Sequence, residues 1–155
     1  MTKVQPRKPA GAVTKIRNDG HSFEKIEYAK LNSRQQENYN FQKIAARLAD
    51  HGFNCIRLSD DWHGADFIAC HIDGRTFLKI QQKSRLSLDK RYIGRDVYIA
   101  FFHGDDLYVY QHDAMIDALV TAGLLREDTA SWQRGGYSWP GLSRQLIALL
   151  EDFKI

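Results

Sequence analysis

The first regular pattern along the chain is helical. The apolar positions of residues 34–51 recur three and four residues apart; they are Phe41, Ile44, Ala45 and Leu48. Ser33 stands where a helix N-cap belongs and Gly52 where a C-terminal stop belongs. The pattern therefore predicts an amphipathic helix over residues 34–51 that packs by one stripe.

Five runs rich in β-branched and aromatic residues follow this helix, and each predicts a strand. They are residues 53–59, 65–72, 75–86, 97–102 and 107–111. Asp73-Gly74 lies between the second and third runs and is a strong signal for a two-residue hairpin loop. Polar loops are predicted over residues 60–64 and 87–95.

The C-terminal third returns to helical spacing. Residues 112–123 and 142–153 predict two helices, separated by an irregular segment at 125–141. The order of helix, five strands, helix, loop and helix predicts an α/β domain whose mixed five-stranded sheet is flanked by helices.

The charge along the chain is uneven. The 155 residues carry a net charge of +3, but the first 20 hold five basic residues and one acid, and the rest hold 17 basic and 18 acidic residues. We therefore expect a flexible basic N-terminal arm over residues 1–30 and one domain over residues 31–155. The arm would hold nucleic-acid phosphates or serve only as a solubilising tail.

The composition argues against several classes of protein. No apolar run approaches the roughly 20 residues of a membrane span, and the basic start lacks the apolar stretch of a secretory signal. Cys55 and Cys70 form no C-x-x-C pair, and the six histidines show no zinc-ligand spacing. We expect a cytoplasmic protein with two reduced, buried thiols and no membrane partner.

Glu37 provides the first candidate for chemistry. It shares one helix face with the apolar stripe, because it precedes Phe41 by four residues. A buried carboxylate is unfavourable unless it has a partner. Glu37 therefore either faces a functional site beneath the helix or lies in the first turn, where the helix dipole favours acids.

The predicted hairpin provides the second candidate. If Asp73-Gly74 forms its loop, paired residues have numbers that add to 147, so Asp66 lies opposite Gln81. Directly paired residues share a face, and alternation adds Lys79 and Lys83 to it. Leu78, Ile80 and Gln82 then lie on the opposite face. An acid, an amide and a lysine thus converge at one end of the hairpin.

This combination suits phosphodiester hydrolysis. A carboxylate and a neutral oxygen can hold a divalent cation that polarises a phosphoryl oxygen. A lysine beside them can orient or deprotonate the attacking water, or offset charge in the transition state. The structural alternative is that Asp66 and Lys83 form a surface ion pair.

The run from Glu37 through Gly64-Ala65-Asp66 to Gln81-Gln82-Lys83 resembles the PD-(D/E)XK nuclease superfamily, in its Gln-x-Lys variant. The resemblance covers roughly residues 34–122. It implies a restriction-endonuclease-like core, as in Holliday-junction resolvases. Ala65 replaces the proline of the motif, and Gln81 replaces its second acid.

The resemblance also implies roles for these residues. Asp66 would be the central ligand of Mg²⁺ or Mn²⁺, with Glu37 and the carbonyl of Gln82 as further metal ligands. Glu37, Asp66, Gln81 and Lys83 would form the catalytic set. The family's habit favours DNA as the substrate, and a homodimer would suit symmetric cleavage of a duplex.

Further residues are candidates for nucleic-acid contacts. Trp62 and His63 precede Asp66 and would stack on bases or touch phosphates, although Trp62 would serve equally as a lid over the core. A basic cluster would bind phosphates or remain a solvated surface; its members are Lys79, Arg85, Lys90, Arg91 and Arg95. The acids of the preceding loop, Asp60 and Asp61, would add a ligand or stay solvated. The segment 131–141 would shape a substrate site or be anchored to the core by Trp132 and Trp139.

Three functions remain open from sequence alone. The first is a metal-dependent nuclease acting on DNA. The second is a nucleic-acid-binding module on the same fold that does not cleave. The third is a small interaction or assembly protein whose acids pair with lysines.

Overall fold

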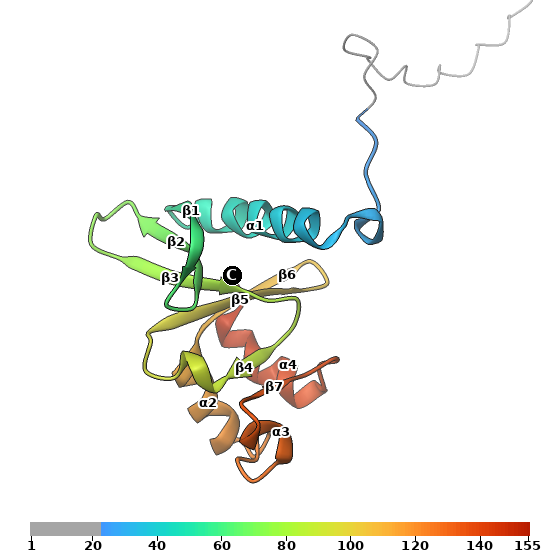
Figure 1. Ribbon diagram of the computed structural model, residues 1–155, viewed down its shortest axis with the longest axis vertical. Coiled ribbons are helices and arrows are strands. Elements are labelled where there is room, and N and C mark those ends of the chain that lie inside the picture. Colours follow the sequence, from blue (N-terminus) through green and yellow to red (C-terminus); the bar gives the residue numbers. More distant parts are fainter. Residues whose placement is uncertain (1–22) are drawn as a thin grey trace, which may run out of the picture.

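The computed structural model describes residues 23–155 and contains two sheets (Figure 1). The larger sheet has the order β1-β2-β3-β5-β6. Its strands are β1 (Phe53–Trp62), β2 (Ala65–His71), β3 (Phe77–Gln82), β5 (Val97–His103) and β6 (Asp106–Gln111). Only β3 and β5 run parallel, so the sheet is mixed. The smaller sheet pairs β4 (Ser87–Asp89) with β7 (Gly136–Ser138).

Helices cover both faces of the larger sheet (Figure 1). The α-helices are α1 (Ser33–Ala49), α2 (His112–Thr121), α3 (Ala130–Gln133) and α4 (Arg144–Leu150), and the 3₁₀ turns are η1 (Tyr28–Lys30), η2 (Lys90–Tyr92) and η3 (Glu151–Phe153). Ile44 and Leu48 of α1 pack on Phe67 and Ile80. On the other face, α2 and α4 pack on β5 and β6 through Met115 and Leu150. The predicted α/β class and five-stranded mixed sheet are confirmed.

Helix α1 follows the prediction closely, apart from its cap. Asn32, not Ser33, is the N-cap, because its side chain accepts from the backbone N–H of Gln35 at 2.9 Å. The Gln35 side chain returns a bond to the Asn32 N–H, which completes a capping box. Gly52 ends this region with φ +80°, in the left-handed conformation that favours glycine.

The first strand is longer than predicted. β1 runs to Trp62, so the predicted loop at 60–64 shrinks to a tight turn at His63 and Gly64, both with positive φ. The pairing is irregular between Arg57 and Trp62. The Asp61 side chain accepts from the Gly64 N–H at 2.7 Å and so stabilises this turn. The polar residue Asp61 therefore belongs to a strand end and its turn, not to a longer loop.

The second hairpin has the predicted register but not the predicted loop. Phe67 pairs with Ile80 and Cys70 with Phe77, and both pairs add to 147. The His71 N–H donates to the Thr76 carbonyl at 2.9 Å and closes a loop of residues 72–75, in which the Asp73 side chain accepts from the N–H groups of residues 75 and 76. A four-residue loop with the same centre preserves the register.

The two segments predicted as irregular pair with each other. Ser87 pairs with Ser138 and Asp89 with Gly136, so residues 87–95 and 125–141 contain β4, η2, α3 and β7. Leu88, Tyr92 and Trp132 are each 3% exposed and anchor this region in the core. The prediction of two plain loops was wrong because isolated apolar residues carry no period.

Residues 1–22, which hold most of the expected basic arm, lie outside the described part of the chain. Within residues 23–155, no helix has the length and apolar character to cross a membrane. Cys55 and Cys70 are unbridged and half-buried, less buried than the prediction had them.

Candidate functional site

Asp66 lies where strands β2 and β3 stop pairing. One carboxylate oxygen, Oδ2, accepts from the Gln82 backbone N–H at 2.9 Å and from Gln81 Nε2 at 2.8 Å. The side chain thus takes the place of the next ladder hydrogen bond beyond the pair Phe67–Ile80. Its other oxygen, Oδ1, accepts no hydrogen bond within residues 23–155, so a rigidly held carboxylate presents one free oxygen.

The environment of Asp66 disfavours its charge. Its pKa is raised above the ordinary value of 3.8, chiefly by burial, and the nearby Glu37 carboxylate adds to the increase. The Gln82 N–H, the charge of Lys83 and the Gln81 amide act in the opposite direction. Since burial outweighs these contacts, a cation beside the free oxygen would be favourable.

A cavity of about 870 Å³ opens beside Asp66. Its lining residues come from α1, β1 and β2; they are Ser33, Arg34, Glu37, Arg57, Leu58, Ser59, Asp60, Asp61 and Asp66. The cavity therefore joins both carboxylates, Glu37 and Asp66, that the sequence indicated.

Glu37 is half-exposed, with 50% of its side chain accessible, and forms an ion pair with Arg57 of β1. The expectation that it lies on the buried stripe was wrong, because its carboxylate turns from the core toward Arg57. The helical turn that contains Glu37 nevertheless lies over the end of β3, because Gln82 Nε2 donates to the Glu37 backbone carbonyl at 3.1 Å.

A hard divalent cation at Asp66 would be held mainly by water. Residues 23–155 contain no group of three or more His, Cys, Asp and Glu side chains placed to hold a metal. However, Asp66 has its free Oδ1, and the buried amide oxygen of Gln82 has no hydrogen-bond partner. A buried acceptor without a partner calls for a donor or a cation, and Mg²⁺ commonly keeps several waters beside one or two carboxylates.

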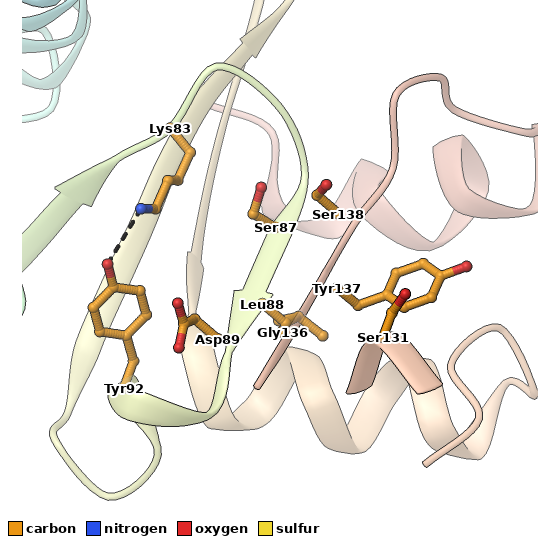
Figure 2. A pocket seen from close by; sticks show the side chains of 9 residues that line it. All are labelled: Lys83, Ser87, Leu88, Asp89, Tyr92, Ser131, Gly136, Tyr137 and Ser138. Atoms are coloured by element: carbon orange, nitrogen blue, oxygen red, sulfur yellow. Dashed lines mark hydrogen bonds between the residues drawn. The ribbon is translucent and has the colours of Figure 1, made fainter. Parts of the chain in front are cut away.

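Lys83 follows β3 directly, and its backbone N–H donates to the Ala100 carbonyl at 2.9 Å. Its ammonium donates to the Tyr92 hydroxyl at 3.2 Å and lies 5.4 Å from the centre of that ring (Figure 2). Lys83 and Asp66 do not form the ion pair considered as the structural alternative. The structure thus brings Asp66, Gln81 and Gln82 into contact and directs the Lys83 side chain toward Tyr92.

Tyr92 is a residue that the sequence did not single out. It is 3% exposed and packs edge-on against His112, with ring centres 5.6 Å apart. It also lies against Gly64, where a Cβ atom would come within 2.7 Å of its ring. Tyr92 therefore connects the turn before Asp66 with the side chain of Lys83.

The start of α2 holds the segment that carries Tyr92. His112 is fully buried, and its Nε2 accepts from the Asp89 N–H at 3.1 Å while Nδ1 bonds to Asp113 at 3.0 Å. Asp113 also accepts from the Gly94 N–H at 2.9 Å. Burial alone would raise the pKa of Asp113, but the bonds from His112 and Gly94 lower it. Both ends of the segment 89–94 are thereby fixed.

The residues expected to touch nucleic acid occupy varied surroundings. Trp62 is 63% exposed beside His63, so its alternative role as a core lid was wrong. Lys79 bonds to the Arg95 carbonyl, and Arg85 is exposed. Lys90 lies over the Trp132 ring, and Arg91 pairs with Asp89 at 2.9 Å.

The segment 131–141 was predicted either to shape a substrate site or to be anchored to the core. Trp132 is buried and anchors it, as the second alternative requires.

Comparisons with known proteins identify no family for this chain. No protein-family model matches the sequence, and no curated protein matches it. One similar solved structure is a bacterial homing endonuclease, with a TM-score of 0.46 and 13% identity over 79% of this chain and 86% of that one. Another is a Holliday junction resolvase from the archaeal hyperthermophile Archaeoglobus fulgidus, with a TM-score of 0.36 and 19% identity over 45% of this chain and 74% of that one. At such low values, the function of this chain has to be argued from its own residues.

Proposed function

We propose that this protein is a metal-dependent nuclease that hydrolyses phosphodiester bonds, with DNA as the favoured substrate. The observation that carries the proposal is the setting of Asp66. A partly buried carboxylate with raised pKa is held by two N–H donors at one oxygen, and its residue lines a large cavity. Perturbed carboxylates in cavities are typical of catalytic and metal sites.

Five residues have roles in this proposal. Asp66 Oδ1 and the Gln82 oxygens would hold Mg²⁺ or Mn²⁺, with Glu37 as a further ligand once it leaves Arg57. When bound, the ion supplies polarisation of the phosphoryl oxygen. Gln81 holds Asp66 in place through its amide. Lys83, on its flexible stem, would offset negative charge or orient the attacking water.

A non-cleaving nucleic-acid-binding module on the same fold is the second candidate. Two observations favour it: the Glu37 carboxylate is occupied by Arg57, and Gln81 directs an N–H, not an oxygen, at Asp66. Such a module would bind nucleic acid without metal, and its affinity would fall with salt.

The purified full chain is expected to cleave DNA only when Mg²⁺ or Mn²⁺ is added. Duplex, single-stranded and branched DNA should each be incubated with either metal and with EDTA, and the products resolved on denaturing gels. Metal-dependent cleavage supports the nuclease. Salt-dependent binding with no cleavage of any of the three substrates supports the module instead.

Changing Gln81 to Glu tests whether this point of the sheet binds metal. The Gln81 amide nitrogen lies 2.8 Å from Asp66 Oδ2, so Gln81→Glu places two carboxylates together. Their repulsion should lower the thermal midpoint in EDTA by several °C. Mn²⁺ should then raise the midpoint of the variant more than that of the wild type, because binding to the folded state stabilises it.

The matched control is Gln145→Glu, which adds the same charge on the exposed surface of α4. This variant should respond to Mn²⁺ like the wild type. If Gln81→Glu gains no more stabilisation from Mn²⁺ than Gln145→Glu does, Asp66 and residue 81 do not form a metal site.

A further inference from the structure

A second cavity, of about 460 Å³, has Lys83 in its lining (Figure 2). Its volume falls within the ~300–1,000 Å³ typical of ligand sites. The lining comes from the end of β3, the β4–β7 sheet, η2 and α3; the residues are Lys83, Ser87, Leu88, Asp89, Tyr92, Ser131, Gly136, Tyr137 and Ser138. The cavity therefore adjoins the end of β3, where the Gln82 N–H donates to Asp66.

Most polar side chains of this cavity have donors to offer. The Lys83 ammonium has three N–H groups and gives only one to Tyr92. Tyr92 accepts that bond, so its own O–H proton remains available, although its side chain is almost fully buried. The hydroxyls of Ser131 and Ser138 make no hydrogen bond within residues 23–155.

The charge of the cavity favours an anion. Asp89 is the only acid in its lining, and Arg91 compensates it through an ion pair at 2.9 Å. Lys83 forms no ion pair within the described part of the chain. A half-buried ammonium that forms no such ion pair and is surrounded by hydroxyl donors attracts a phosphate group more strongly than a neutral ligand.

We propose that this cavity binds a backbone phosphate of the nucleic-acid strand, next to the phosphodiester at Asp66. The proposal rests on the nuclease or binding function proposed above. Asp66 accepts from the Gln82 N–H, and Lys83 is the next residue, so a strand crossing the end of β3 meets both cavities in turn. The β4–β7 sheet is then a part of the substrate surface.

Binding of an eight-nucleotide oligothymidylate that has no terminal phosphate tests this proposal. The measurement is made in EDTA, so that no metal-dependent cleavage occurs. We expect Ser138→Glu to weaken its affinity about tenfold, since a carboxylate would face the phosphate at close range. Tyr92→Phe should weaken it severalfold by removing one donor. Gln145→Glu, with the same charge on α4, should bind as the wild type does.

NMR spectra of the same samples locate the ligand. The oligonucleotide should shift the amide resonances of Ser87, Asp89 and Ser138, and inorganic phosphate at equal concentration should shift them much less. Equal effects of inorganic phosphate would show a small-anion site and overturn the proposal. So would wild-type affinity of Ser138→Glu, or shifts confined to other surfaces. Failure of metal-dependent cleavage would leave these measurements unaffected and would contradict only the nuclease.

Discussion

Replacing Asp66 with Asn is expected to abolish metal-dependent cleavage and to stabilise the metal-free protein. Activity should fall at least about 100-fold, because the variant loses the carboxylate that accepts from the Gln82 N–H at the end of β3. The amide oxygen of Asn can still accept from the Gln82 N–H and the Gln81 amide, so the local fold is kept. Single-turnover cleavage at saturating Mn²⁺ measures the loss.

The stability gain follows from the direction of the pKa shift. The folded-state pKa of Asp66 lies above its ordinary value of 3.8, so the folded protein binds the proton more tightly than the unfolded chain does. Stability of the wild type therefore falls as pH rises from 3.8 through the raised value, and stays reduced above it. Asp66→Asn should be the more stable protein at neutral pH in EDTA, with the difference vanishing in acid.

Asp117→Asn is the matched control, because it removes an equal charge from an exposed position of α2. It should retain full cleavage and the thermal midpoint of the wild type. Retained cleavage in Asp66→Asn would remove Asp66 from the site. Loss of cleavage together with lower stability at neutral pH would indicate a structural role for the carboxylate.

The contact between Asp66 and Gln81 could be predicted because it depends only on strand register. In a hairpin the numbers of paired residues have a constant sum, and the predicted sum of 147 was correct although the predicted loop was too short. Helix phase likewise brought the turn of Glu37 over β3. Period and register are local properties that each sequence segment carries by itself.

The partners of the charged side chains could not be predicted in the same way. The ion pair of Glu37 with Arg57 crosses from helix to strand, and the contact of Lys83 with Tyr92 depends on how the segment 89–94 folds back. That segment is fixed by His112 and Asp113, which come about twenty residues later in the sequence. No sequence pattern links these two residues to the segment that they hold. Single polar contacts between distant elements leave no periodic trace in the sequence.

Gly64→Ala is expected to destabilise the protein by about 2–5 kcal/mol. Gly64 has φ +93°, where an L-residue loses roughly 1–2 kcal/mol. Its new Cβ would also meet the Tyr92 ring at 2.7 Å, and overpacking of this kind typically costs about 1–3 kcal/mol. Urea unfolding measures the loss, a large part of the roughly 5–15 kcal/mol that stabilises a typical domain.

Gly74→Ala separates the two contributions. Gly74 also has positive φ, +66°, but a Cβ there meets nothing within 4 Å, so only the backbone strain should appear. If Tyr92 causes the excess, Gly64→Ala should be less harmful in a Tyr92→Leu background, and the double-mutant cycle measures that coupling. Equal losses for the two glycines would contradict the close packing of Tyr92 on the turn. A loss at Gly64 relieved by Tyr92→Leu would establish the contact that links the Asp66 turn to Lys83.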